Sequence, residues 1–418
     1  MATVLERTLR IGLTSAILLF SARAEAQTPL RLNTTTFITV GEGLAAGVGD
    51  FSLHQASQQN SFPALLAKQF GALFPQPLIQ APGLGGVQGF PAQPVMVPAP
   101  GQTTVRSQFP PTLFVFNLAV PGHRLSDAIS LRPRPPLVHS SDARQTATNI
   151  ILGYPSMIFG THIPLWSQLQ YAEAMNPTLV LVELGYAEAL DAATLGDAKR
   201  LPTPEVFAAG YRELLLRLRA NYATVIVTTI PDPTDTAYFS SIADAAQLSG
   251  VPAATLAARY ALEPDDLLTP GALMAIGAGQ ETLPPRSLLR AGTAAAIDRG
   301  VQALNEVIAA EAELSQAVYY DLNALFARLR GAPLQVGNLR LNASYLGGLY
   351  SLSGAFLGAT GNALIANEII GALNQKFHTN IPSINLAEIV SNDPAVRFRP
   401  TSLSEVLATD STGRVDEK

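Results

Sequence analysis

Five short runs of branched apolar and aromatic residues, separated by stretches with helical periodicity, constrain the fold of this chain most. The runs cover residues 36–41, 113–120, 178–185, 224–231 and 317–325. Each has the length and composition of a buried strand. Strands that alternate with helices predict a parallel sheet with helices on both faces, whose ligands lie at the carboxyl ends of the strands.

Four longer segments carry the start and stop signals of helices. They cover residues 61–71, 204–221, 293–315 and 361–376. The first opens with a serine, has Pro63 in its first turn and ends at a glycine, and the second follows Thr203. Serine and threonine cap helix N-termini, and glycine commonly ends a helix. These four segments are therefore predicted helices.

Three connections are longer than the loops that usually join such elements. They cover residues 75–111, which are rich in proline, 124–166, and 236–290, which include a small helix pattern near residues 253–262. We expect them to form a cap of insertions, with the first as a proline-stiffened flap. Residues 392–418 are polar and predict a frayed tail.

The N-terminus has the three parts of a secretory signal peptide. Arg7 and Arg10 precede an apolar stretch at residues 11–20, and Ala24 and Ala26 form a small-residue cleavage pattern. We expect residues 1–26 to be removed on export to the periplasm or the extracellular space, leaving no integral membrane segment in the mature chain. The chain has no cysteine, so we expect neither a disulfide nor a lipid anchor.

Charge and histidine spacing argue against several classes of partner. The formal net charge is −5 and only 14% of the residues are charged, so a nucleic-acid-binding function is not expected. Four histidines are scattered without the spacing of metal ligands: His54, His139, His162 and His378. We expect neither a metal nor a cofactor. The oligomeric state is left open.

The first strand run enters a glycine turn at residues 41–47, which is how a nucleophile elbow at the top of an α/β sheet begins. Such a turn normally presents a serine, cysteine or aspartate to a general base. The tip of this turn is Gly43. Because glycine has no side chain to react, the elbow has no nucleophile.

Five blocks in the same order resemble the SGNH (GDSL-type) esterase and lipase family, from about residue 36 to residue 393. The blocks are Gly41-Glu42-Gly43-Leu44 with the helix from Asn60-Ser61-Phe62-Pro63, Asn117-Leu118-Ala119-Val120-Pro121-Gly122, Glu183-Leu184-Gly185-Tyr186-Ala187-Glu188, Asp321-Leu322-Asn323-Ala324, and Ser351-Leu352-Ser353-Gly354-Ala355-Phe356-Leu357. The resemblance implies a flavodoxin-like, three-layer α/β/α sandwich with a five-stranded parallel sheet, formed by residues 27–391.

The residues that carry the chemistry of this family are replaced here. The resemblance assigns the nucleophile to Gly43, the orienting acid to Ser353, the general base to Phe356 and the oxyanion asparagine to Ala187. Gly122, whose backbone N–H is an oxyanion donor in the family, is retained. Loss of a nucleophile or base costs on the order of 10⁶ in turnover in a well-studied serine protease. We therefore expect no catalytic residue at these positions.

Several neighbouring residues are candidate substitutes or pocket residues. His123 is either an exposed loop residue or a base that serves Ser351 or Ser353. Glu42 and Glu188 either cap helix N-termini or act as paired carboxylates. Glu183, within an apolar strand run, is expected to be a hydrogen-bonded carboxylate facing the helix layer.

Phe356 and Leu357 make the former site more apolar. Either the phenylalanine ring fills the space of the lost serine and histidine, or it lines a pocket for a small apolar or ester-like ligand.

Three hypotheses follow. The first is a secreted, catalytically inactive SGNH-hydrolase-like protein with a binding or structural role. The second is a carboxylic-ester hydrolase with relocated catalytic groups, which needs His123 near a serine of the pocket. The third is a surface scaffold whose old cleft has no function, which is favoured if Phe356 leaves no cavity.

Overall fold

The computed structural model describes residues 31–81, 83–85, 106–107, 113–160, 164–397 and Leu403. The expected signal peptide at residues 1–26, most of the proline-rich insertion and most of the tail lie outside these ranges. His162 lies outside them as well.

A four-stranded parallel sheet forms the centre of the molecule. Its strands are β1 (Phe37–Gly41), β2 (Leu179–Glu183), β3 (Thr224–Thr228) and β6 (Val318–Tyr320), in the order β1-β2-β3-β6. Phe37 is paired with Leu179, and Leu179 in turn with Thr224. Every residue of β1 and β2 is buried, as expected for a parallel sheet that is covered on both faces. Four of the five predicted strands are thus confirmed.

The fifth expected strand, at residues 113–120, is not a strand of this sheet. It runs beside β1 through a single parallel bridge between Thr39 and Asn117, and the Leu118 N–H donates to the Thr39 carbonyl at 2.9 Å. The Asn117 side chain accepts from the Ala119 N–H at 3.2 Å and donates to the Ala45 carbonyl at 3.0 Å. Backbone hydrogen bonds continue on both sides of this bridge, from the Thr39 N–H to the Phe116 carbonyl at 2.9 Å and from the Val120 N–H to the Gly41 carbonyl at 3.1 Å. The segment therefore stays beside β1 without becoming a full strand of the sheet.

The four predicted helices are present. They are α4 (Phe62–Phe70), α10 (Pro204–Leu218), α14 (Ala291–Leu314) and α16 (Ala359–Phe377). At α10 the Thr203 hydroxyl accepts from the Val206 N–H, and α4 ends at Gly71 in the left-handed conformation. The threonine cap and the glycine stop are therefore confirmed, whereas Ser61 stands at the N-terminus of α4 without a side-chain cap bond and donates to the Gln58 carbonyl instead.

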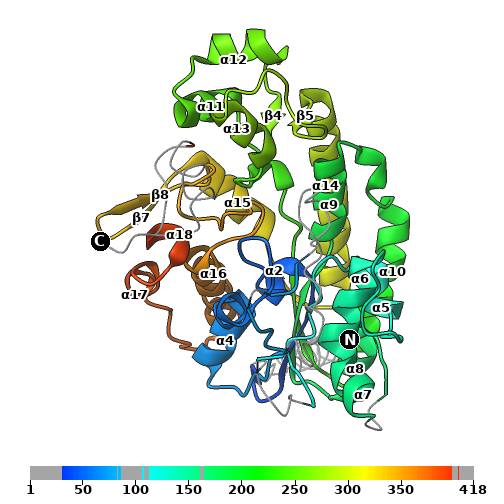
Figure 1. Cartoon of the computed structure of the whole chain (residues 1–418). Coiled ribbons are helices and arrows are strands. Elements are labelled where there is room, and N and C mark those ends of the chain that lie inside the picture. The colour runs from blue at the N-terminus through cyan, green and yellow to red at the C-terminus, as the bar shows by residue number, and fades with distance from the viewer. Residues whose placement is uncertain are drawn as a thin grey trace, which may run out of the picture.

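The helices lie in two groups on opposite sides of the strands (Figure 1). On one side α16 contacts α4, α17 (Leu386–Val390) and β6. On the other side α10 contacts α5 (Leu125–Ser130), α8 (Gln168–Ala174) and α14, while α14 also contacts β3 and α9 (Tyr186–Leu195). Short α2 (Gly43–Ala46) follows β1 directly and contacts α9. No helix among the described residues is long and apolar enough to cross a membrane.

The insertion at residues 124–166 is largely helical where it is described. It contains α5, α6 (Ala143–Thr148), the π-helical turn η1 (Asn149–Gly153) and α7 (Tyr154–Phe159). Ile150, Ile151 and Leu152 belong to the main hydrophobic core. The described parts of residues 75–111 also pack on that core through Ile79 and Leu84. These parts are packed elements rather than a free flap.

The third insertion, at residues 236–290, forms a small lobe with its own core. It contains α11 (Ile242–Ser249), α12 (Ala253–Tyr260), α13 (Pro270–Gly277) and the antiparallel pair β4 (Leu267–Leu268) and β5 (Leu288–Leu289). Figure 1 shows this lobe at one end of the molecule. Leu256, Leu273 and Leu403 are buried together in its core. Leu403 belongs to the segment that the sequence predicts to be a frayed tail, yet this residue is packed in the core of the lobe.

The remaining elements connect these parts. They are α3 (Gln55–Gln59), η2 (Ala198–Arg200), η3 (Pro233–Asp235), α15 (Leu322–Gly331), β7 (Leu334–Val336), β8 (Leu339–Leu341) and α18 (Pro394–Arg397).

Candidate functional site

The positions that the resemblance assigns to catalysis are gathered at the carboxyl edge of the sheet. Gly43 begins α2 immediately after β1, and Ala187 lies in the first turn of α9 after β2. Gly122 follows the segment beside β1, whose Val120 N–H donates to the Gly41 carbonyl at 3.1 Å. The Tyr186 hydroxyl donates to the Ala355 carbonyl at 2.8 Å and so joins the start of α9 to the last block.

The ring of Phe356 occupies the space above Gly43. A Cβ atom on Gly43 would lie 2.6 Å from Cε1 and 2.9 Å from Cζ of this ring, closer than real Cβ contacts. Phe356 is 1% exposed and packs edge-on against Tyr186, with ring centroids 6.0 Å apart. Of the two alternatives for Phe356, the structure shows the one in which the ring fills the position. A serine side chain at residue 43 has no room while this ring is present.

The two serines of the last block are used within their own turn. The Ser351 and Ser353 hydroxyls are 2.9 Å apart, and the Ser351 hydroxyl also lies 3.0 Å from the Phe356 carbonyl. The Ser353 oxygen accepts from the Phe356 N–H at 3.4 Å. Both serines are buried. The bonds hold the turn that presents Phe356.

Two carboxyl groups are buried side by side next to the elbow. Glu42 is the N-cap of α2, and its Oε2 accepts from the Gly43 N–H at 2.5 Å. Oε2 of Glu183 accepts from the N–H groups of Glu42 and Ala45, at 3.3 and 3.1 Å. Burial raises the pKa of Glu183 to about 8, although these backbone donors lower it. Burial, together with the neighbouring Glu183, raises the pKa of Glu42 well above its ordinary value. The pair thus organises the elbow backbone, and burial favours the protonated form of both carboxyl groups.

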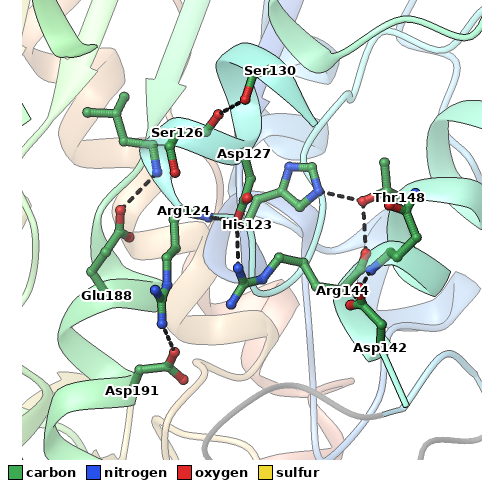
Figure 2. A network of polar contacts seen from close by, with 12 residues as sticks. His123, Arg124, Ser126, Asp127, Ser130, Asp142, Arg144, Thr148, Glu188 and Asp191 are labelled. Atoms are coloured by element: carbon green, nitrogen blue, oxygen red, sulfur yellow. Dashed lines mark hydrogen bonds and ion pairs between the residues drawn. The ribbon is translucent and has the colours of Figure 1, made fainter. Parts of the chain in front are cut away.

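Glu188 lies in the first turn of α9 and connects it to α5. Its Oε1 accepts from the Leu125 N–H at 2.8 Å, whereas its buried Oε2 has no hydrogen-bond partner among the described residues. Burial raises the pKa of this carboxyl to about 7. Figure 2 shows Glu188 beside Arg124, whose guanidinium is paired with Asp191 at 2.8 Å. One carboxyl oxygen therefore holds α5, and the other is buried without a hydrogen-bond partner among the described residues.

His123 is neither an exposed loop residue nor a base for the serines of the last block. It is fully buried, and its Nε2 is 2.7 Å from the Thr148 hydroxyl (Figure 2) while Gln168 Nε2 is 2.8 Å from its Nδ1. Burial lowers the pKa of the imidazole to about 3. Both sequence-based alternatives for His123 are corrected, because Thr148 of α6 and Gln168 of α8 hold the buried ring from either side. A buried neutral histidine with both nitrogens engaged is a structural residue.

Ser351 and Leu357 line a hollow of about 220 Å³ that lies between the last block and α3. His54 and Asp393 also line it, which places a hydroxyl, an imidazole and a carboxylate around one space. Each is engaged elsewhere, since His54 caps α3 and Asp393 accepts from the Thr360 and Ala395 N–H groups at 2.7 and 3.0 Å. The required nucleophile-to-base hydrogen bond is not formed by these groups.

A second hollow, of about 430 Å³, lies between α5, α9 and α10. Glu188 and Arg124 line it together with apolar residues of α5 and α10. Glu188 was a candidate from its sequence block, whereas Arg124, two residues after Gly122, was not, and its charge close to that block is the signal that could have pointed to it. The residues that α10 contributes to this hollow belong to no sequence motif, so only the tertiary structure shows that they lie there.

No group of three or more histidine, cysteine, aspartate or glutamate residues in the described part of the chain is arranged to hold a metal ion. Comparisons with protein-family models, with curated proteins and with solved structures each found no match. What the structure itself establishes is an α/β protein built on a four-stranded parallel sheet, with small antiparallel pairs in its insertions.

Proposed function

We propose that this chain is an SGNH-hydrolase-like protein with a three-layer α/β/α core that no longer cleaves esters at the family site. It acts instead as a binding or structural protein. Support comes from the arrangement of the blocks. The elbow, the Gly122 segment, the start of α9 and the last block meet at one edge of the sheet, in the order that the resemblance implies, while none of the four replaced side chains has the required chemistry.

The single observation that carries this proposal is the contact between Phe356 and Gly43. The ring fills the position where a nucleophile would stand, and it comes from the position where the base would stand. Protein interiors pack at close to crystalline density, and here the ring of Phe356 contributes to that packing. The site therefore lacks both the reactive side chains and the room that a serine at residue 43 would need.

The alternative, an ester hydrolase with relocated groups, required His123 to reach a serine of the pocket. The hydrogen bonds of His123 to Thr148 and Gln168 remove the observation that would have favoured it.

A labelling and turnover experiment tests the proposal. The protein is incubated with a fluorophosphonate probe and with short-chain p-nitrophenyl esters, beside the quadruple variant Gly43→Ser, Ala187→Asn, Ser353→Asp and Phe356→His. We expect no labelling and no turnover above background for the unmodified chain. The variant should gain both, because a triad acts as a unit.

Each outcome of that experiment has a separate meaning. Turnover by the unmodified chain would refute the non-catalytic function. A variant that retains the circular dichroism spectrum but gains neither labelling nor turnover would show that the backbone of the site has departed from the family geometry. Single replacements within the set should remain inactive, which makes them the matched controls.

We also propose export, on the basis of residues 1–26. The mass of the protein recovered outside the cytoplasm tests this, since cleavage after residue 26 gives a chain that starts at Gln27. A retained N-terminus or an added acyl mass would refute it.

A further inference from the structure

The hollow between α5, α9 and α10 combines an apolar wall with two unsatisfied polar groups. Its volume of about 430 Å³ lies within the roughly 300–1,000 Å³ of small-molecule sites. Ile129 and Val206 supply the apolar surface, and Val206 is 67% exposed, whereas Phe207 lies behind them in the core at 1% exposed. The hollow therefore places exposed apolar surface beside a buried carboxyl group.

Glu188 supplies the first unsatisfied group. It is 4% exposed, it lines the hollow, and its buried Oε2 has no partner among the described residues. Leaving a buried polar atom without a partner costs roughly 1–3 kcal/mol. A ligand that hydrogen-bonds Oε2 recovers this cost.

Arg124 supplies the second. Its Nη2 is paired with Asp191, while its buried Nε has no hydrogen-bond partner among the described residues. Figure 2 shows the Arg124 side chain running alongside Glu188 and ending at Asp191. Two polar atoms beside the hollow therefore lack a protein partner among the described residues. They are Glu188 Oε2, which accepts a hydrogen bond or donates one when protonated, and Arg124 Nε, which donates one.

The charges around the hollow balance. Its lining contains two arginines and two glutamates, namely Arg124, Arg200, Glu188 and Glu213. Arg124 is already paired with Asp191, and Arg200 lies 3.8 Å from Asp197. An anionic ligand would meet arginines that already have acidic partners, and a cationic ligand would compete with Arg124 for Glu188, so either charge would be bound at a cost. A neutral head group that both donates and accepts a hydrogen bond satisfies both free groups at no such cost.

We propose that this hollow, lined by Arg124, Glu188, Val206 and Phe207, is a binding site for a neutral amphiphile with an alkyl tail and a hydroxyl or carboxamide head. The tail lies against α5 and α10, and the head bonds Glu188 Oε2 and Arg124 Nε. This site is separate from Gly43 and Phe356. The inference rests on the proposed binding role and not on the loss of catalysis.

Calorimetric titration with three probes that share one tail tests the ligand class. The probes are 1-octanol, octanoate and octylammonium, titrated into the full mature chain at one pH and ionic strength. We expect 1-octanol to bind at least tenfold more tightly than either ion. Tighter binding of octanoate or octylammonium would refute the neutral head group, and absence of binding by all three would refute the site.

Two matched variants on α10 locate the binding. Val206→Gln removes apolar surface from the hollow, whereas Leu216→Gln changes a residue of the same helix that is 66% exposed and does not line it. Glutamine is a good helix former, so both variants should fold. We expect Val206→Gln to weaken 1-octanol binding roughly tenfold, the scale of one buried aliphatic side chain. Leu216→Gln should change it less than twofold, and equal effects of the two variants would refute the site.

Variants of Glu188 test the head group. Glu188→Gln keeps an oxygen for Leu125 and a second hydrogen-bonding group, so 1-octanol binding should stay within about threefold. Glu188→Leu removes both hydrogen-bonding groups and should abolish 1-octanol binding. Retention of binding in a folded Glu188→Leu chain would refute the role of the carboxyl group. Ester turnover is measured separately, so failure of the non-catalytic function and failure of this site remain distinguishable.

Discussion

Replacing Gly43 with alanine should destabilise the protein, because the new methyl group meets the ring of Phe356. The methyl carbon would lie 2.6 Å from Cε1 and 2.9 Å from Cζ, whereas ordinary contacts begin near 3.4 Å. The ring cannot turn aside freely, since it is 1% exposed and packed against Tyr186. Overpacking of this kind costs about 1–3 kcal/mol in the free energy of unfolding.

Gly371→Ala is the matched control. Gly371 lies within α16, and a Cβ there has no neighbour within 4 Å. Alanine should stabilise the helix at this position by roughly 0.5–1 kcal/mol because it reduces the freedom of the unfolded chain. The two glycine-to-alanine changes should therefore shift stability in opposite directions.

A double-mutant cycle with Phe356→Ala connects the cost to the ring. The single change Phe356→Ala should cost about 3–5 kcal/mol. Once the ring is absent, Gly43→Ala should add little, which gives a coupling energy of about 1–3 kcal/mol between the two positions. Urea denaturation of the four proteins, analysed with a common m-value, measures this energy. If Gly43→Ala behaves like Gly371→Ala, or costs the same with and without the ring, then Phe356 does not fill the elbow.

Three further predictions concern buried groups. The pKa of Glu183 is about 8 in the folded chain and about 4.5 in the unfolded chain, so the free energy of unfolding should fall as the pH rises between these values. Glu183→Gln should make the fall in Tm between pH 5 and pH 8 shallower. For His123 the pH dependence of stability has the opposite sign. Its pKa is about 3 in the folded chain and 6.5 in the unfolded chain, so the protein should lose stability as the pH falls below 6.5. His123→Gln should reduce the fall in Tm measured from pH 7 to pH 4. Leu273→Ala should destabilise the small lobe by about 2–5 kcal/mol, so that amide hydrogen exchange becomes faster in residues 236–290 but not in β1 and β2. Faster exchange in β1 and β2 as well would show that the lobe and the sheet unfold as one unit.

Local signals in the sequence are sufficient for the framework of this protein. The cap at Thr203, the glycine after α4 and the runs of branched residues in β1, β2 and β3 act within a few residues of one another, so helices and strands follow from them directly. Residues 113–120 are the exception, because they keep backbone hydrogen bonds to β1 but form only one bridge with it, a difference that their local pattern does not reveal.

The same locality limits what the sequence says about the site. That Gly43 has no side chain to react follows from its identity alone, and this needs no structure. His123 is different. Its neighbours in sequence suggested an exposed loop, and only the packing of Thr148 and Gln168 around its ring shows that it is buried and neutral.

Contacts between segments far apart in the chain decided the rest. The Phe356 ring reaches Gly43 across more than 300 residues, and Glu188, Arg124 and Val206 meet only because α5, α9 and α10 pack together. Sequence identity determines which groups are present, but distance and burial determine their pKa, their partners and the space beside them. Those quantities depend on every segment that packs around a group. The sequence alone therefore showed that Gly43 has no reactive side chain and left two alternatives for Phe356, whereas only the tertiary structure chose between them and revealed the hollow beside α10.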